Sequence, residues 1–255
     1  MAEEPILYLE SVSKHFGAVE ALSNVDFDVR PGEVMALVGD NGAGKSTLIK
    51  GIAGIYPFDS GQMFWEGQPV KVHGPRDVAA LGIEIVYQDL ALADNLDVVA
   101  NMFLGRERVG SFRRLDESDM EKACRETLKS LSVTTVSSVR QAVAELSGGQ
   151  RQAIAVAKAV MWNSKVVILD EPTAALGVAQ TRQVLDLVRR LADRGLGVVI
   201  ISHNLHDIFE VADRITVLRL GQRVAVLKSS ETTQQEVVHA ITAGKLDNVP
   251  GMVVQ

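Results

Sequence analysis

The sequence predicts an α/β fold with a mainly parallel sheet, an N-terminal antiparallel β subdomain and a helical insertion subdomain. Alternating apolar and polar positions in residues 6–30 and 62–72 predict half-buried antiparallel strands that pair with each other. Helical periodicity dominates residues 90–163, including 118–132 and 150–162, and this predicts a helical subdomain inserted into the core. Three continuous apolar runs predict strands covered on both faces, as in a parallel sheet. These runs span residues 34–38, 166–169 and 198–201.

The first apolar run is followed directly by GDNGAGKST, which fits the phosphate-loop pattern G-x-x-x-x-G-K-[ST] between a strand and a helix. Glycines let the backbone bend until several N–H groups point at one phosphate, and the helix that follows adds the positive end of its dipole. Lys45 is expected to reach the β- and γ-phosphates, and the Ser46 hydroxyl is expected to hold Mg²⁺. A chance glycine-rich turn before an amphipathic helix is the competing interpretation. The motif therefore predicts a P-loop NTPase core, with nucleotide-binding residues Gly39, Asp40, Asn41, Gly42, Ala43, Gly44, Lys45, Ser46 and Thr47.

Polar residues also follow other predicted strands, at the ends where open α/β sheets place their ligands. Gln88 follows an apolar stretch at 83–87, Asp170 and Glu171 follow the second apolar run, and His203 follows the third. Asp170 offers the carboxylate oxygen that Mg²⁺ prefers near phosphates. Glu171 is our candidate general base for the attacking water. The residues assigned to catalysis are Glu171, His203, Gln88 and Lys45, and those assigned to the metal are Ser46, Gln88 and Asp170.

Each of these assignments competes with a structural role. Asp170 and Glu171 could cap a helix, Gln88 could be a solvated surface residue, and His203 could be an imidazole packed in a loop. The spacing of His203 and His206 could also suggest a metal pair, but the sequence offers no evident set of further ligands.

A second glycine-rich sequence, LSGGQ at residues 146–150, precedes a helical run and predicts another anion-binding helix start. Its phosphate-facing residues are Ser147, Gly148, Gly149 and Gln150. One chain therefore carries two phosphate-facing surfaces. They lie about 100 residues apart in the sequence and open different helices.

Composition limits the classes of function. The chain has 255 residues, 47% of them hydrophobic, and a net charge of −6, which argues against a nucleic-acid partner. No apolar run approaches the roughly 18 residues that a membrane span needs. The acidic start MAEEPILYLE lacks the pattern of a secretory signal, so secretion is not expected. The single cysteine, Cys124, cannot form an internal disulfide and is expected to be inert packing in a helix.

The phosphate loop, Gln88, the signature LSGGQ, the strand that ends in Asp170 and Glu171, and His203, in this order, resemble an ATP-binding cassette (ABC) ATPase. The resemblance covers residues 5–244, which implies a single cassette at 1–244, with a helical subdomain at about 90–163, and a C-terminal tail at 245–255. The phrases IVYQDLAL, NMFLGRE, EPTAALG and ISHNL are similar to bacterial monosaccharide importers of the ribose, xylose and fructose type, in their short single-cassette form.

This resemblance implies an enzyme that hydrolyses ATP, with ATP and Mg²⁺ bound between two cassettes in a head-to-tail homodimer. It implies an integral membrane sugar permease as partner and, indirectly, an extracytoplasmic sugar-binding protein, with the cassette peripheral on the cytoplasmic face of the membrane. Phe16 stands where the family stacks an aromatic ring on adenine, although it could instead belong to the core. Gly177 stands where the family usually has an aspartate that contacts the opposite subunit.

Two other functions compete with transport. One is a soluble ABC ATPase acting in DNA repair or translation, but such proteins tend to need a long coiled-coil insertion, tandem cassettes or a basic face. The other is a regulator that binds ATP without turnover, against which the presence of both Glu171 and His203 argues.

Overall fold

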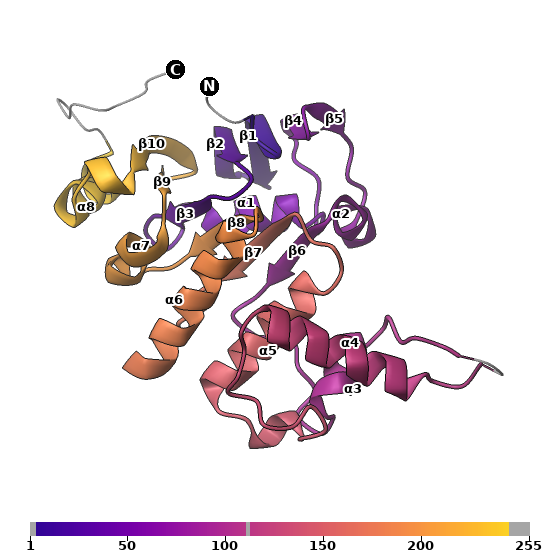
Figure 1. Ribbon diagram of the computed structural model, residues 1–255. Helices are drawn as coiled ribbons and strands as arrows, with labels where there is room; N and C mark the ends of the chain where they lie inside the picture. The colour runs from indigo at the N-terminus through magenta and orange to yellow at the C-terminus, as the bar shows by residue number, and fades with distance from the viewer. Residues whose placement is uncertain (1–3, 111–112, 245–255) are drawn as a thin grey trace.

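The computed structural model describes residues 4–110 and 113–244, and the predicted tail at 245–255 lies outside them. Within these residues, strands form two sheets, and helices pack around them (Figure 1). The central sheet has the strand order β10-β9-β3-β8-β7-β6, and the N-terminal sheet has the order β2-β1-β4-β5. The α/β fold class predicted from the sequence is confirmed.

All strand pairs of the central sheet are parallel except β9 with β10, which is antiparallel. The strands are β3 (Val34–Val38), β6 (Ile83–Val86), β7 (Val166–Asp170), β8 (Gly197–Ile201), β9 (Arg214–Arg219) and β10 (Gln222–Lys228). Alternate residues of one strand enter different cores, as in β3, where Ala36 faces the helical side and Met35 faces the N-terminal sheet. The three apolar runs are therefore strands buried on both faces, as predicted.

The N-terminal sheet is antiparallel throughout, because β1 pairs with β2 and β4, and β4 pairs with β5. Its strands are β1 (Leu7–Phe16), β2 (Val19–Val29), β4 (Ser60–Trp65) and β5 (Gln68–Val70). Helix α1 (Lys45–Ile52) follows β3 directly and shares a core with this sheet and with one face of the central sheet. The pairing predicted between the two alternating stretches is confirmed by the register of Tyr8 opposite Phe64.

The helical subdomain contains α3 (Val98–Phe103), α4 (Glu117–Ser130) and α5 (Gly148–Val160), which lie together at the lower right of Figure 1. It is less helical than the periodicity of residues 90–163 predicted. The connections between these helices are irregular. Some of their backbone groups bond within the same loop, as Gly110 N–H does with the Arg114 carbonyl, and others bond to a helix start, as the Val139 carbonyl does with Val99 N–H of α3. Cys124 is fully buried on α4, and burial raises the pKa of its thiol to about 12.

The elements after His203 were not predicted from the sequence. The chain there forms α7 (Leu205–Val211), the hairpin of β9 and β10, and α8 (Gln234–Ala243). Two further α-helices are α2 (Pro75–Leu81) before β6 and α6 (Val178–Asp193) between β7 and β8, and short 3₁₀ helices span Val143–Glu145 and Ser229–Glu231. None of the helices in residues 4–110 and 113–244 is both long and apolar enough to cross a membrane.

Candidate nucleotide site

The four strand ends that carry the predicted site residues are neighbours in the central sheet. Strands β3, β8, β7 and β6 lie side by side and run parallel, so their carboxyl ends meet along one edge. The structure therefore brings together the phosphate loop, His203, the pair Asp170 and Glu171, and Gln88. This juxtaposition could be predicted because each of these residues lies at the end of a short strand or within two residues after it.

The phosphate loop bends where its glycines allow a close approach to other backbone segments. Gly39 has a φ of 152°, and a Cβ there would lie 2.2 Å from the Leu218 carbonyl oxygen. Gly44 has a φ of 106°, and a Cβ there would lie 2.9 Å from the Ala21 carbonyl oxygen. A side chain at either position would push the loop away from its supports. The glycine spacing of the motif thus has a geometric cause in this chain.

The turn between β9 and β10 supports the phosphate loop from outside the motif. Gly221 N–H donates to the Ala43 carbonyl at 3.0 Å, and the Gly221 carbonyl accepts from Ser23 N–H at 2.8 Å. This support was not predicted from the sequence. A glycine between two apolar stretches, LRLGQRVAV, is the signal that could have revealed the hairpin.

Lys45 folds back over the phosphate loop. Its Nζ donates to the Gly39 carbonyl at 2.6 Å and to the Asp40 carbonyl at 3.0 Å. Burial lowers the pKa of Lys45, while the negative charges of Glu171, Asp40 and Asp170 oppose that shift. The Lys45 ammonium group is thus partly removed from water and lies beside two backbone carbonyls. A group of this kind is suited to bind the negative charge of a phosphate chain.

Asp170 and Glu171 differ in environment although they are adjacent. Burial raises the pKa of Asp170, and the charge of Glu171 raises it further, against the opposing charges of Lys45 and Lys50. A half-buried carboxylate of this kind fits a divalent cation, which would offset the cost of its charge. The described residues hold no group of three or more His, Cys, Asp or Glu side chains able to bind a metal without phosphate oxygens.

Glu171 and His203 form the closest contact between two predicted catalytic residues. His203 Nδ1 lies 2.9 Å from Glu171 Oε2. The Glu171 side chain is only 17% exposed, whereas that of His203 is 80% exposed, so the imidazole covers the carboxylate from the solvent side. The backbone of Glu171 has a φ of 50°, a left-handed conformation that costs about 1–2 kcal/mol for a residue with a Cβ. Backbone strain of this kind is typical of functional residues whose side chain is held in one orientation.

Polar contacts to the buried Asp207 brace the loops that carry Glu171 and His203, and the sequence motifs did not predict them. Thr173 Oγ1 donates to Asp207 Oδ2 at 2.7 Å, and Asn204 Nδ2 donates to Asp207 Oδ1 at 2.9 Å. Asp207 is 3% exposed. It therefore ties the loop after β7 to the start of α7, which follows His203. Its spacing from Asn204 resembles ordinary helix capping, so no pattern in the sequence indicates the long-range contact with Thr173.

The signature LSGGQ opens α5, as predicted. Ser147 caps the helix, because its Oγ accepts from Gln150 N–H at 3.4 Å while Gln150 Oε1 accepts from Ser147 N–H at 2.8 Å. Gly149 packs against α6, where an added Cβ would lie 3.0 Å from the Gln180 side chain. Ser147 and Gly148 stay exposed. The signature is thus a rigid helix start that faces solvent in the single chain.

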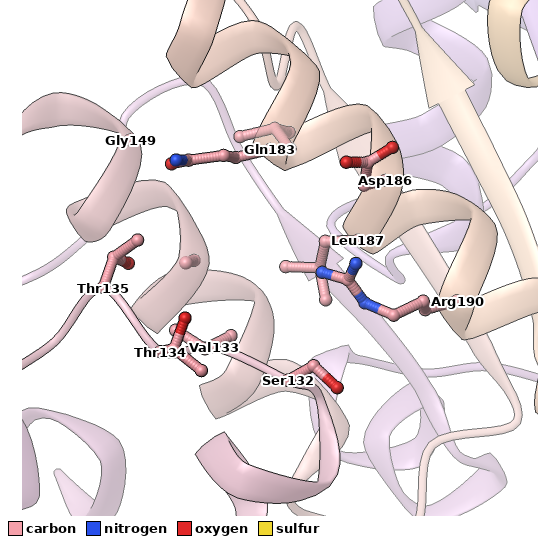
Figure 2. A pocket seen from close by; sticks show the side chains of 11 residues that line it. Ser132, Val133, Thr134, Thr135, Gly149, Gln183, Asp186, Leu187 and Arg190 are labelled. Carbon is pink, nitrogen blue, oxygen red and sulfur yellow. The ribbon is translucent and has the colours of Figure 1, made fainter.

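A cavity of about 150 Å³ lies beside the signature (Figure 2). Its walls are the loop 132–135, the start of α5 at Gly149, and α6, from which Gln183, Asp186 and Arg190 extend. None of its lining residues comes from the phosphate loop, so this cavity is not the nucleotide site.

Phe16 ends β1 and is 48% exposed, so its ring lies at the surface rather than in the core.

Gly177 is exposed directly before α6, and Val178, the first residue of that helix, is 91% exposed. The chain therefore presents the signature and an uncovered apolar side chain at the N-termini of two helices in contact, α5 and α6.

The fold and these strand ends define a P-loop nucleotide-binding domain with a helical insertion and a glycine-rich signature. Residues 22–174 match the family described as ABC transporter. The chain belongs to the ABC transporter family, as its ATP-binding cassette, and the family predicted from the sequence motifs is confirmed.

Relatives extend this similarity over nearly the whole chain. The fructose import ATP-binding protein FrcA of Rhizobium meliloti is 48% identical over 251 residues, which cover 96% of each chain. The xylose/arabinose import ATP-binding protein XylG of Sulfolobus acidocaldarius is 45% identical over 244 residues, again 96% of each chain. A crystal structure of a nucleotide-free ATP-binding cassette from an ABC transporter has a TM-score of 0.79 at 28% identity, covering 88% of this chain and 92% of that one.

Proposed function

We propose that this chain is the ATP-hydrolysing subunit of an importer that takes up a monosaccharide through a partner permease. The observation that carries the proposal is the similarity over 96% of the chain to two proteins named for sugar import. The names of these relatives favour import over the alternative of DNA repair or translation, and the net charge of −6 gives no support to a nucleic-acid partner. The cassette would act as a peripheral protein on the cytoplasmic face of the membrane.

The site residues supply the chemistry of ATP hydrolysis. The phosphate-loop amides and the Lys45 ammonium would hold the phosphate chain of ATP. Ser46, Gln88 and Asp170 would hold Mg²⁺, which when bound neutralises phosphate charge. Glu171 would take the proton from the water that attacks the γ-phosphorus, and the bond to the ADP oxygen would break. His203, 2.9 Å from this carboxylate, would keep it aimed at that water.

The proposed assembly is a homodimer of cassettes bound to an integral membrane sugar permease, with an extracytoplasmic sugar-binding protein as an indirect partner. Exposure of Ser147 and Gly148 supports a composite site, because they open α5, a different helix from α1, which follows the phosphate loop. The cassette itself need not touch the sugar. The residues described here therefore carry no preference for one sugar over another.

A sugar-uptake assay tests the import proposal. Cells that lack this chain are expected to lose ATP-dependent uptake of one radiolabelled sugar from a panel of fructose, xylose, arabinose and ribose. The intact chain should restore that uptake, and the Glu171→Gln variant should not. Unchanged uptake of all four sugars, with ATPase activity still present in the purified protein, would reject import of these sugars while leaving ATP hydrolysis untouched.

Phe16→Ala is expected to weaken nucleotide binding by about 5- to 150-fold, because stacking of a base on an aromatic ring contributes about 1 to 3 kcal/mol. The melting temperature of the nucleotide-free protein should change little, since the ring is 48% exposed. Calorimetric titration and thermal melting check both values. A core role would show the reverse: a lower melting temperature with nucleotide affinity unchanged.

A further inference from the structure

Phe16 does not stand alone at the end of β1. The Tyr56 ring, in the segment after α1, meets it edge-to-face, with the ring centroids 5.2 Å apart and the planes at 83°. This is one of the favoured geometries for aromatic pairs. Tyr56 is half-buried, in contrast to the exposed Phe16. The better-buried ring therefore fixes the orientation of the more exposed one.

Tyr56 is also attached to the helix that follows the phosphate loop. Its hydroxyl donates to the Thr47 carbonyl at 3.0 Å, and Thr47 lies in the first turn of α1, two residues after Lys45. Burial raises the pKa of the Tyr56 phenol, so the hydroxyl stays a donor at neutral pH. One side chain thus links the exposed Phe16 ring to the proposed phosphate-binding residues.

Lys14 completes the cluster. Its Nζ lies 5.6 Å from the centroid of the Phe16 ring and 5.4 Å from that of Tyr56, within cation–π range of both. Asp59 holds this ammonium at 2.7 Å and accepts from His15 N–H at 2.6 Å. These bonds lower the pKa of Asp59 to about 2, so the ion pair persists at neutral pH. Tyr56 and Lys14 therefore cover part of the Phe16 ring, and the rest of the ring is exposed to solvent.

We propose that Tyr56 is a positioning residue for the nucleotide base. It holds the Phe16 ring in a fixed orientation and at a fixed place relative to the phosphate-binding helix, through its hydrogen bond to Thr47. A ring that is already oriented loses less conformational freedom when a base stacks on it. This inference rests on the proposed function, in which Phe16 stacks on adenine.

The test compares the affinities of each variant for Mg-ADP and for pyrophosphate, which has the same number of phosphates without adenosine. Tyr56→Leu is expected to weaken Mg-ADP about 2- to 12-fold, the range expected from loss of an aromatic pair. Its affinity for pyrophosphate should stay unchanged. Tyr56→Phe keeps the ring contact and loses only the hydrogen bond to Thr47, so its loss of ADP affinity should be smaller than that of Tyr56→Leu, which loses both.

Tyr8→Leu is the matched control, because Tyr8 lies on β1, the strand that ends in Phe16, and pairs with a phenylalanine, Phe64, at a centroid distance of 5.8 Å. Tyr8→Leu should change neither the affinity for Mg-ADP nor the affinity for pyrophosphate. The ratio of the two affinities, rather than either alone, reports positioning of the base, since a folding defect would reduce both.

The outcomes separate this inference from the function on which it rests. If Phe16→Ala changes the ratio of ADP to pyrophosphate affinity but Tyr56→Leu does not, the positioning role of Tyr56 is wrong while base stacking stands. If Phe16→Ala also leaves the ratio unchanged, base stacking itself is rejected. Equal weakening of both ligands in Tyr56→Leu would mean that Tyr56 only supports the fold of the phosphate loop, and that result would also overturn the inference.

Discussion

Glu171→Gln is expected to retain ATP binding and to lower the rate of ATP turnover by about 10²- to 10⁴-fold, the usual contribution of a positioned general base. The amide keeps the shape of the carboxylate but cannot accept the proton of the attacking water. The left-handed backbone at this position and the 2.9 Å contact with His203 point to a side chain held in one orientation. Steady-state phosphate release, with ATP binding measured separately, checks both parts.

Two comparisons make this result specific. Glu210→Gln makes the same substitution at an exposed position of α7, and it should leave turnover at the parental rate. Lys45→Ala should instead lose ATP binding, because the ammonium interacts with the phosphates before any chemistry occurs. Parental turnover in Glu171→Gln would show that the base assignment is wrong, whatever the state of binding.

Much of the core could be predicted because it depends on local patterns. Strand β3 matches the predicted bounds, and β7 and β8 each differ by one residue at one end, since a short apolar run buried on both faces is distinct from its polar flanks. The nucleotide site could be predicted without knowing the order of β3, β7 and β8 in the sheet. In a parallel sheet, the residue after each strand points to the same edge wherever that strand lies.

The supporting contacts could not be predicted, because they join positions far apart in the chain. Tyr56 lies 40 residues from Phe16, and Asp207 lies 34 residues from Thr173. Nothing in the sequence around Tyr56 or Asp207 departs from an ordinary turn or helix start. The hairpin of β9 and β10, which supports the phosphate loop through Gly221, was missed for a different reason: that part of the sequence carries no motif residue, so its strand pattern went unassigned.

The phosphate loop and the signature lie at the starts of two different helices, and this arrangement bears on how two copies of the chain would assemble. Lys45 opens α1, which follows β3, whereas Ser147 caps α5, which packs through Gly149 against α6. Ser147 and Gly148 face solvent, and nearby on α6 Val178 is 91% exposed. A second copy of the chain, placed head-to-tail, would give the signature a phosphate and cover this apolar side chain.

ATP is therefore expected to drive dimerisation, most clearly in Glu171→Gln, where hydrolysis cannot release the second cassette. Sedimentation at tens of micromolar protein should show a monomer without nucleotide and a dimer with Mg-ATP. Ser147→Arg should abolish the dimer, because a bulky side chain would stand against the phosphate of the opposite subunit. Its melting temperature must be measured too, since loss of the helix cap alone costs about 0.5–2 kcal/mol.

Ser118→Arg, an equivalent change at an exposed serine of α4, is the matched control and should dimerise normally. The position of Gly177 makes the experiment informative, because this exposed residue before α6 has no side chain with which to contact a second subunit. A Glu171→Gln protein that binds Mg-ATP but stays monomeric would show that ATP alone does not hold the pair together. The remaining energy would then have to come from the permease, and adding that partner should restore the dimer.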